Sequence, residues 1–98
     1  MKLLNFIWVE ILVLNLIGND KMLMNLIKEA RDLMENTHSY DSQIAGKIDA
    51  TLDGIKNGKE YSEIFLKGLL EDSLDLFENT HSDEYETYFK IEKYLKKN

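Results

Sequence analysis

The sequence of 98 residues contains neither cysteine nor proline. Without cysteine the chain can form no disulfide, no thiolate metal site and no cysteine nucleophile. Proline is the residue that most strongly interrupts helices, so its absence, with an apolar fraction of 44%, predicts an all-α protein. A chain of this length buries roughly 60–65% of its unfolded surface, which suffices for one small domain over residues 1–98 but not for a deep enclosed pocket.

Motifs of catalysis are also lacking. The five glycines form no phosphate-binding loop, and no nucleophile motif occurs. The two histidines, each close to a carboxylate, are only a weak acid–base signal. We therefore expect no enzyme, no catalytic residue and no cofactor.

Basic residues are scarce in one stretch of the chain. Residues 60–89 hold nine acidic residues against Lys67 alone, within a net charge of −6 for the whole chain. Phosphate contacts need cations, so this stretch argues against direct binding of nucleic acid. It favours a protein partner with a basic surface.

One long apolar run is present. Residues 3–17 read LLNFIWVEILVLNLI, and a helix of that length spans roughly 22 Å, short of a ~30 Å hydrocarbon core. We expect an apolar N-terminal helix over residues 1–18 that packs on the rest of the domain or forms a homodimer with a second copy. Membrane contact through residues 3–17 is the alternative, so the expected location is the cytoplasm or the membrane periphery.

The pentapeptide ENTHS occurs twice, at residues 35–39 and 78–82. When residues 22–52 are aligned with residues 65–95, 12 of 31 positions are identical. Each copy reads as a helix, a short turn and a helix, and neither copy could bury its apolar stripe alone. The repeat predicts an antiparallel four-helix bundle of two duplicated hairpins, residues 20–57 and 60–97, after the apolar helix.

Helical spacing of apolar residues predicts where these helices lie. Of the four helices in the two hairpins, the first should end near residue 36 and the third should start near Glu60. Thr37, Ser39, Thr80 and Ser82 are expected to cap the helices that follow them. The four apolar stripes are Leu23, Leu26, Ile27, Ala30, Leu33 and Met34; Ile44, Ile48, Leu52 and Ile55; Tyr61, Phe65, Leu66, Leu69, Leu70 and Phe77; and Tyr85, Tyr88, Phe89, Ile91 and Leu95.

Each ENTHS copy also contains Glu-x-x-His, the ligand pair of di-metal helical bundles. Helical phase argues against that use. Glu35 falls roughly 150° from the centre of its apolar stripe and Glu78 roughly 140°, so both should face solvent. The prediction is therefore no metal site, with a di-metal bundle kept as a lesser alternative.

Carboxylates in the second copy form a stripe opposite its apolar face, with tyrosines following. Two interpretations of this stripe are open: a solvated face, aided by a Glu63–Lys67 pair, or a docking face for a basic partner. The candidate partner-binding residues are Glu60, Glu71, Asp75, Glu78, Asp83, Glu84, Tyr85 and Tyr88.

Residues 51–76, TLDGIKNGKEYSEIFLKGLLEDSLDL, resemble the second helix, polar loop and third helix of class II bacteriocin immunity proteins. The resemblance covers about a quarter of the chain, and the apolar start and the duplication depart from that family. It implies a small inhibitory module that binds rather than catalyses. The alternative is an acidic inhibitor that occupies the nucleic-acid-binding surface of a phage-defence or DNA/RNA-processing enzyme.

Overall fold

The computed structural model describes residues 21–97, and every regular element within that range is helical. The chain is helical over residues 21–36, followed by α2 (Gln43–Lys56), α3 (Glu63–Asn79) and α4 (Glu86–Lys97). The all-α prediction is confirmed for these residues, and the arrangement is compatible with the expected bundle. The predicted apolar helix over 1–18, with its membrane and homodimer contacts, lies outside the described residues.

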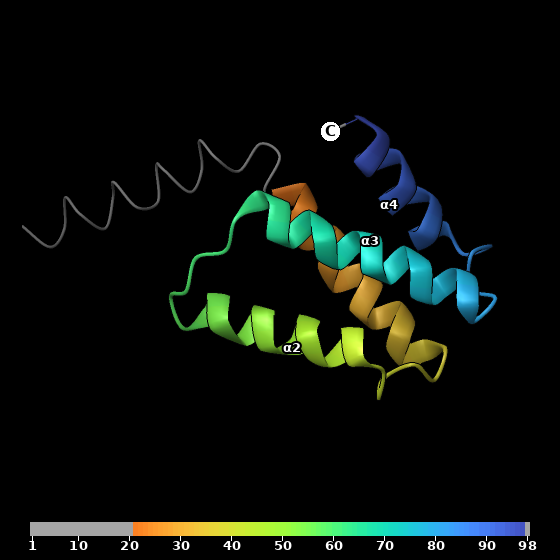
Figure 1. The fold of residues 1–98 in the computed structure, drawn as a ribbon. Coiled ribbons are helices and arrows are strands. Elements are labelled where there is room, and N and C mark those ends of the chain that lie inside the picture. Colours follow the sequence, from red (N-terminus) through yellow and green to blue (C-terminus); the bar gives the residue numbers. More distant parts are fainter. Residues whose placement is uncertain (1–20, 98) are drawn as a thin grey trace, which may run out of the picture.

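The helix of residues 21–36 lies between α2 and α3, and α4 lies beside the C-terminal half of α3 (Figure 1). Two ion pairs connect these elements. Arg31 donates to both carboxylate oxygens of Asp49 on α2, at 2.8 and 3.1 Å. Lys90 on α4 donates to Glu29 at 2.9 Å, although 61 residues separate the two in sequence. The helix of residues 21–36 is therefore attached to both of the shorter helices.

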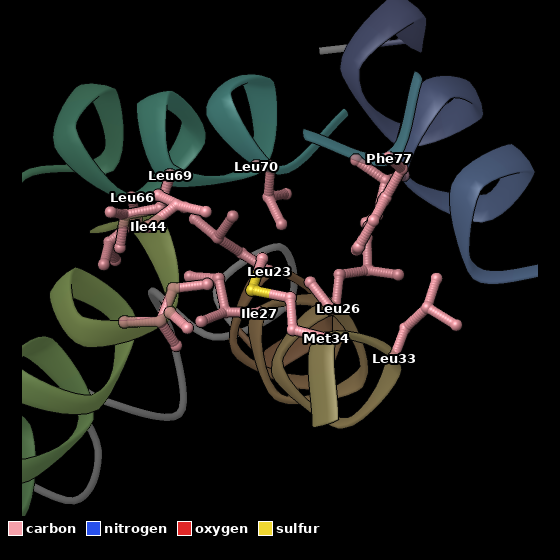
Figure 2. Close-up of a cluster of buried hydrophobic side chains, with 14 of the residues drawn as sticks. Leu23, Leu26, Ile27, Leu33, Met34, Ile44, Leu66, Leu69, Leu70 and Phe77 are labelled. Atoms are coloured by element: carbon pink, nitrogen blue, oxygen red, sulfur yellow. The ribbon is translucent and has the colours of Figure 1, made fainter. Parts of the chain in front are cut away.

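The core is built from the predicted stripes of the helix 21–36 and α3, which face one another (Figure 2). Burial follows the repeat: Leu23 and Leu66 are both buried, as are Met34 and Phe77, which hold equivalent positions 43 residues apart. The shorter helices complete the core. The buried apolar residues are Leu23, Leu26, Ile27, Ala30, Leu33, Met34, Ile44, Ala45, Ile48, Leu66, Leu69, Leu70, Phe77, Ile91 and Tyr94.

The ENTHS repeat forms the end of a helix in both copies. Ser39 N–H donates to the Met34 carbonyl at 2.7 Å, and Ser82 N–H donates to the Phe77 carbonyl at 2.6 Å. His38 has a φ of 62° and His81 a φ of 58°, the left-handed conformation that follows many helix C-termini. Both copies therefore close their helix with a Schellman motif, and the histidine occupies the place usually given to glycine.

The capping prediction for these turns was wrong in direction. The Thr37 hydroxyl donates to the Leu33 carbonyl, and the Thr80 hydroxyl donates to the Leu76 carbonyl, so each threonine caps the helix before it. The helix after the first turn is capped instead by Ser42, whose Oγ accepts from Ala45 N–H at 3.2 Å. The left-handed backbone at each histidine ends the preceding helix, and the threonine hydroxyl is used within that helix end rather than at the start of the next helix.

The connection between the two copies differs from the prediction by three residues. α3 begins at Glu63 rather than near Glu60, because the Ser62 hydroxyl accepts from Phe65 N–H at 3.0 Å and fixes the first turn. Before it, Gly58 takes a φ of 92°, as expected after a helix C-terminus. Glu60 therefore lies in a loop.

Within residues 21–97, no helix has the length and apolar character needed to cross a bilayer.

Candidate functional site

Three predicted site residues share the outer face of α3. Glu71, Asp75 and Glu78 are exposed and follow one another at helical spacings of four and three residues. Asp83 and Glu84, also exposed, follow in the turn that leads into α4. We call these five carboxylates the acidic surface.

Glu60 does not belong to this surface. It precedes the N-cap Ser62, at the opposite end of α3 from Glu78. The rise of an α-helix places the two ends of α3 roughly 24 Å apart. The sequence analysis grouped Glu60 with the other carboxylates because it expected α3 to start near Glu60. Since Ser62 is the N-cap of α3, Glu60 precedes the helix and is not on its face.

The acidic surface has no ion-pair partner within the part of the chain that the structure describes. Among residues 21–97, no lysine, arginine or histidine forms an ion pair with any of its five carboxylates. In the first copy, Arg31 pairs with Asp49 at 2.8 Å and lies 3.9 Å from Glu35. The second copy has Leu74 at the position equivalent to Arg31, so the cation is missing there.

Tyr88 connects α4 to this surface. Its hydroxyl donates to Glu78 at 2.9 Å. This hydrogen bond, with desolvation and the nearby charges of Glu78, Glu92 and Asp83, raises the pKa of Tyr88 to about 12. The Tyr88 hydroxyl is thus fixed to the last turn of α3, near the carboxylates of Glu78, Glu92 and Asp83.

Aromatic side chains lie beside the carboxylates at the start of α4. Tyr85 is 47% exposed and Phe89 is 55% exposed, while Tyr88 is half-buried. The Tyr88 and Phe89 rings meet edge to face, with centroids 5.7 Å apart. We call these three residues the α4 aromatic face.

All three residues of the aromatic face were assigned by the sequence analysis to the apolar stripe of the last helix, and for Tyr85 and Phe89, which are exposed, that assignment was wrong. Phe89 was placed on the apolar stripe of the last helix, but Tyr94 is buried there and Phe89 faces solvent. The repeat held the signal: Tyr85, Tyr88 and Phe89 align with Ser42, Ala45 and Gly46 in the first copy. Three small residues in one copy are three aromatic residues in the other.

The Glu-x-x-His pairs are placed as helical phase predicts. Glu35 and Glu78 are both exposed, and His38 and His81 lie in the turns that follow. Within residues 21–97, no group of three or more His, Cys, Asp or Glu side chains is gathered closely enough to hold a metal ion. These pairs act as helix ends in the described structure.

Comparison of the chain with protein-family models, with curated proteins and with solved structures gave no significant match.

Proposed function

We propose that this protein is a small binding module whose acidic surface receives a basic surface of a partner protein. The observation that carries the proposal is the loss of neutralisation between the copies. Arg31 lies 3.9 Å from Glu35 in the first copy, whereas Leu74 stands in its place in the second and leaves Glu78, the equivalent of Glu35, without an ion pair among residues 21–97.

The position of these charges supports a role in binding rather than in stability. Helix C-termini carry partial negative charge, so nearby carboxylates typically cost about 0.3–1 kcal/mol each. The last turn of α3 contains no basic residue, and Glu78 lies within it. A basic partner would supply the missing counter-charge and would be steered toward the surface before contact.

The form of the module is consistent with inhibition by binding. We infer that the two hairpins pair as an antiparallel bundle, which leaves the outer face of α3 free as a rigid platform. An immunity-type inhibitor would use such a platform against a protein target, as the resemblance of residues 51–76 implies. An inhibitor of a nucleic-acid-processing enzyme would use the same charges in place of phosphates, and the identity of the partner decides between the two.

The repeat provides a matched experiment. Asp75 and Glu78 are equivalent to Asp32 and Glu35, so Asp75→Asn/Glu78→Gln and Asp32→Asn/Glu35→Gln change net charge equally at the same helical positions. Each variant and the unmodified protein would be cross-linked in the producing cells, and captured proteins quantified by mass spectrometry. We expect the first pair to reduce capture of a basic partner at least tenfold and the second to leave it nearly unchanged. Equal capture by all three proteins would refute the proposal.

A further inference from the structure

We propose that the α4 aromatic face, Tyr85, Tyr88 and Phe89, docks a cationic amphipathic segment of the partner, with apolar side chains on the rings and lysine or arginine on the surrounding carboxylates. This inference rests on the proposed function, and adds to it the chemistry of the bound segment. A purely basic surface would not need exposed rings, and the rings are the feature that the charge argument leaves unexplained.

Two of the three rings, those of Tyr88 and Phe89, are held in place by their neighbours. Phe89, 55% exposed, is held edge to face against Tyr88, and the Tyr88 hydroxyl is fixed by its bond to Glu78. Aromatic side chains fixed in this way lose little conformational entropy on binding. Such residues are typical anchors at the centre of protein interfaces.

Charge complementarity selects the occupant. Glu78, Asp83 and Glu92 all lie near enough to Tyr88 to act on its hydroxyl electrostatically. A second copy of this chain would bring the same carboxylates against them, and like charges in contact are repulsive. An apolar segment without cations would leave these carboxylates partly desolvated and unpaired, which is unfavourable. A segment with one apolar and one cationic face satisfies both requirements.

Tyr85 supplies an independent argument. Ser42, at the equivalent position, caps α2 with its hydroxyl. Tyr85 precedes α4 in the same way, with its N–H donating to Ser82 as Ser42 N–H donates to Ser39. A tyrosine side chain is too long to cap the helix that it precedes. A ring is therefore present where a serine would give a more stable helix, which is the expected signature of a residue that serves binding.

The test uses the full chain and two synthetic peptides of 15 residues. One is a lysine–leucine peptide with leucine at helical i, i+3, i+4 and i+7 spacing; the other keeps every lysine and replaces leucine by glutamine. Binding is followed by amide chemical shifts and by titration calorimetry. We expect the amphipathic peptide to bind at least tenfold tighter than the polar one and to shift the amides of residues 78–92.

Three variants locate the binding. Phe89→Ser and Tyr85→Ser should each weaken the amphipathic peptide about tenfold, whereas Ile64→Ser should not, although Ile64 is an apolar residue 85% exposed near the start of α3. Tyr85→Ser should also raise Tm by about 4 °C, because the serine supplies a cap. A folded, more stable variant that binds less well separates loss of contact from loss of structure.

Each contrary result has a distinct meaning. Equal affinity for the two peptides would overturn the aromatic site, and so would a loss of affinity in Ile64→Ser as large as that in Phe89→Ser. If Asp75→Asn/Glu78→Gln abolishes binding of both peptides in that case, the proposed acidic binding module stands without the aromatic site. If Asp75→Asn/Glu78→Gln leaves the affinity for the amphipathic peptide unchanged, both this inference and the proposed function are overturned. If neither peptide binds, only this inference is overturned, because the proposed function is tested separately by cross-linking to the natural partner.

Discussion

His38 and His81 lie 43 residues apart and adopt the same left-handed backbone conformation, with φ of 62° and 58°, each directly after the end of a helix. The helix 21–36 and α3 end at equivalent positions, and α2 and α4 begin at equivalent positions. The duplication is therefore present in backbone conformation as well as in sequence.

Replacement of either histidine by glycine should stabilise the protein. A residue with a Cβ is strained at positive φ, and glycine is not, although glycine gains entropy in the unfolded chain. We expect His38→Gly and His81→Gly each to raise the free energy of unfolding by about 0.5–1 kcal/mol, measured by urea denaturation. His38→Ala and His81→Ala are the controls and should give no gain. A loss of stability on both glycine substitutions would mean that the imidazoles make contacts that outweigh the strain.

Removal of the buried Ser73 hydroxyl should cost nothing. Ser73 is fully buried and donates to the Leu69 carbonyl at 2.7 Å, a carbonyl within the same helix. Ala30 fills the equivalent position in the first copy, also fully buried. Because alanine has the higher helix propensity, Ser73→Ala should change stability by between zero and a gain of about 0.5 kcal/mol.

The reverse substitution, Ala30→Ser, is the control for this position and should destabilise by about 0.5 kcal/mol or more. Both variants can be compared by thermal unfolding. A loss above about 1 kcal/mol in Ser73→Ala would contradict the equivalence of the two positions.

The ion pair between Arg31 and Asp49 should couple more strongly than the pair between Lys90 and Glu29. The first is bidentate and its Arg31 side chain is only 17% exposed, whereas Lys90 is 47% exposed and makes one bond. The hydrogen bond to Asp49, the largest cause, also raises the pKa of Arg31. Double-mutant cycles with Arg31→Met/Asp49→Asn and Lys90→Met/Glu29→Gln should give a coupling energy of about 1 kcal/mol for the first pair and a clearly smaller one for the second.

Salt provides the control for these cycles. Both couplings should fall in 1 M NaCl, with the exposed pair reduced nearly to zero, because screening acts most strongly on exposed charges. Coupling that is equal for the two pairs and independent of salt would show that packing of the long side chains, rather than charge, accounts for it.

The bond from Tyr88 to Glu78 should make stability depend on pH in the alkaline range. The folded pKa of Tyr88, about 12, is above its ordinary value of about 10, so the unfolded chain loses this proton first. The stabilising contribution is complete below about pH 10 and is lost as pH rises toward 12. Tyrosine ring carbon shifts, followed by NMR, give the titration directly.

Glu78→Gln is the variant that checks the cause. Glutamine can still accept the hydrogen bond but has no charge, so the pKa of Tyr88 should fall toward 10. Glu35→Gln, the equivalent change in the first copy, should leave the Tyr88 titration where it is. A Tyr88 pKa that stays near 12 in Glu78→Gln would assign the shift to the retained hydrogen bond or to burial rather than to the charge of Glu78.

Local interactions explain what the sequence by itself determined. Apolar residues at helical spacing predicted the four helices of residues 21–97, most of their core, and the solvent-facing directions of Glu35 and Glu78. The ENTHS copies predicted two equivalent turns. Each of these features depends on residues within one or two helical turns, so the chemical pattern of a short segment suffices to fix it.

The tertiary structure decided which charges are neutralised and which rings are covered. Lys90 reaches Glu29 across 61 residues, and Tyr88 reaches Glu78 across the turn, pairings that no helical spacing specifies. Tyr94 is buried on α4 while Phe89 is exposed, and the N-cap at Ser62 leaves Glu60 in the loop before α3, away from the acidic surface. The reason is geometric: a helix has one inward face, but which residues at its edge are buried depends on the angle at which the neighbouring helix packs.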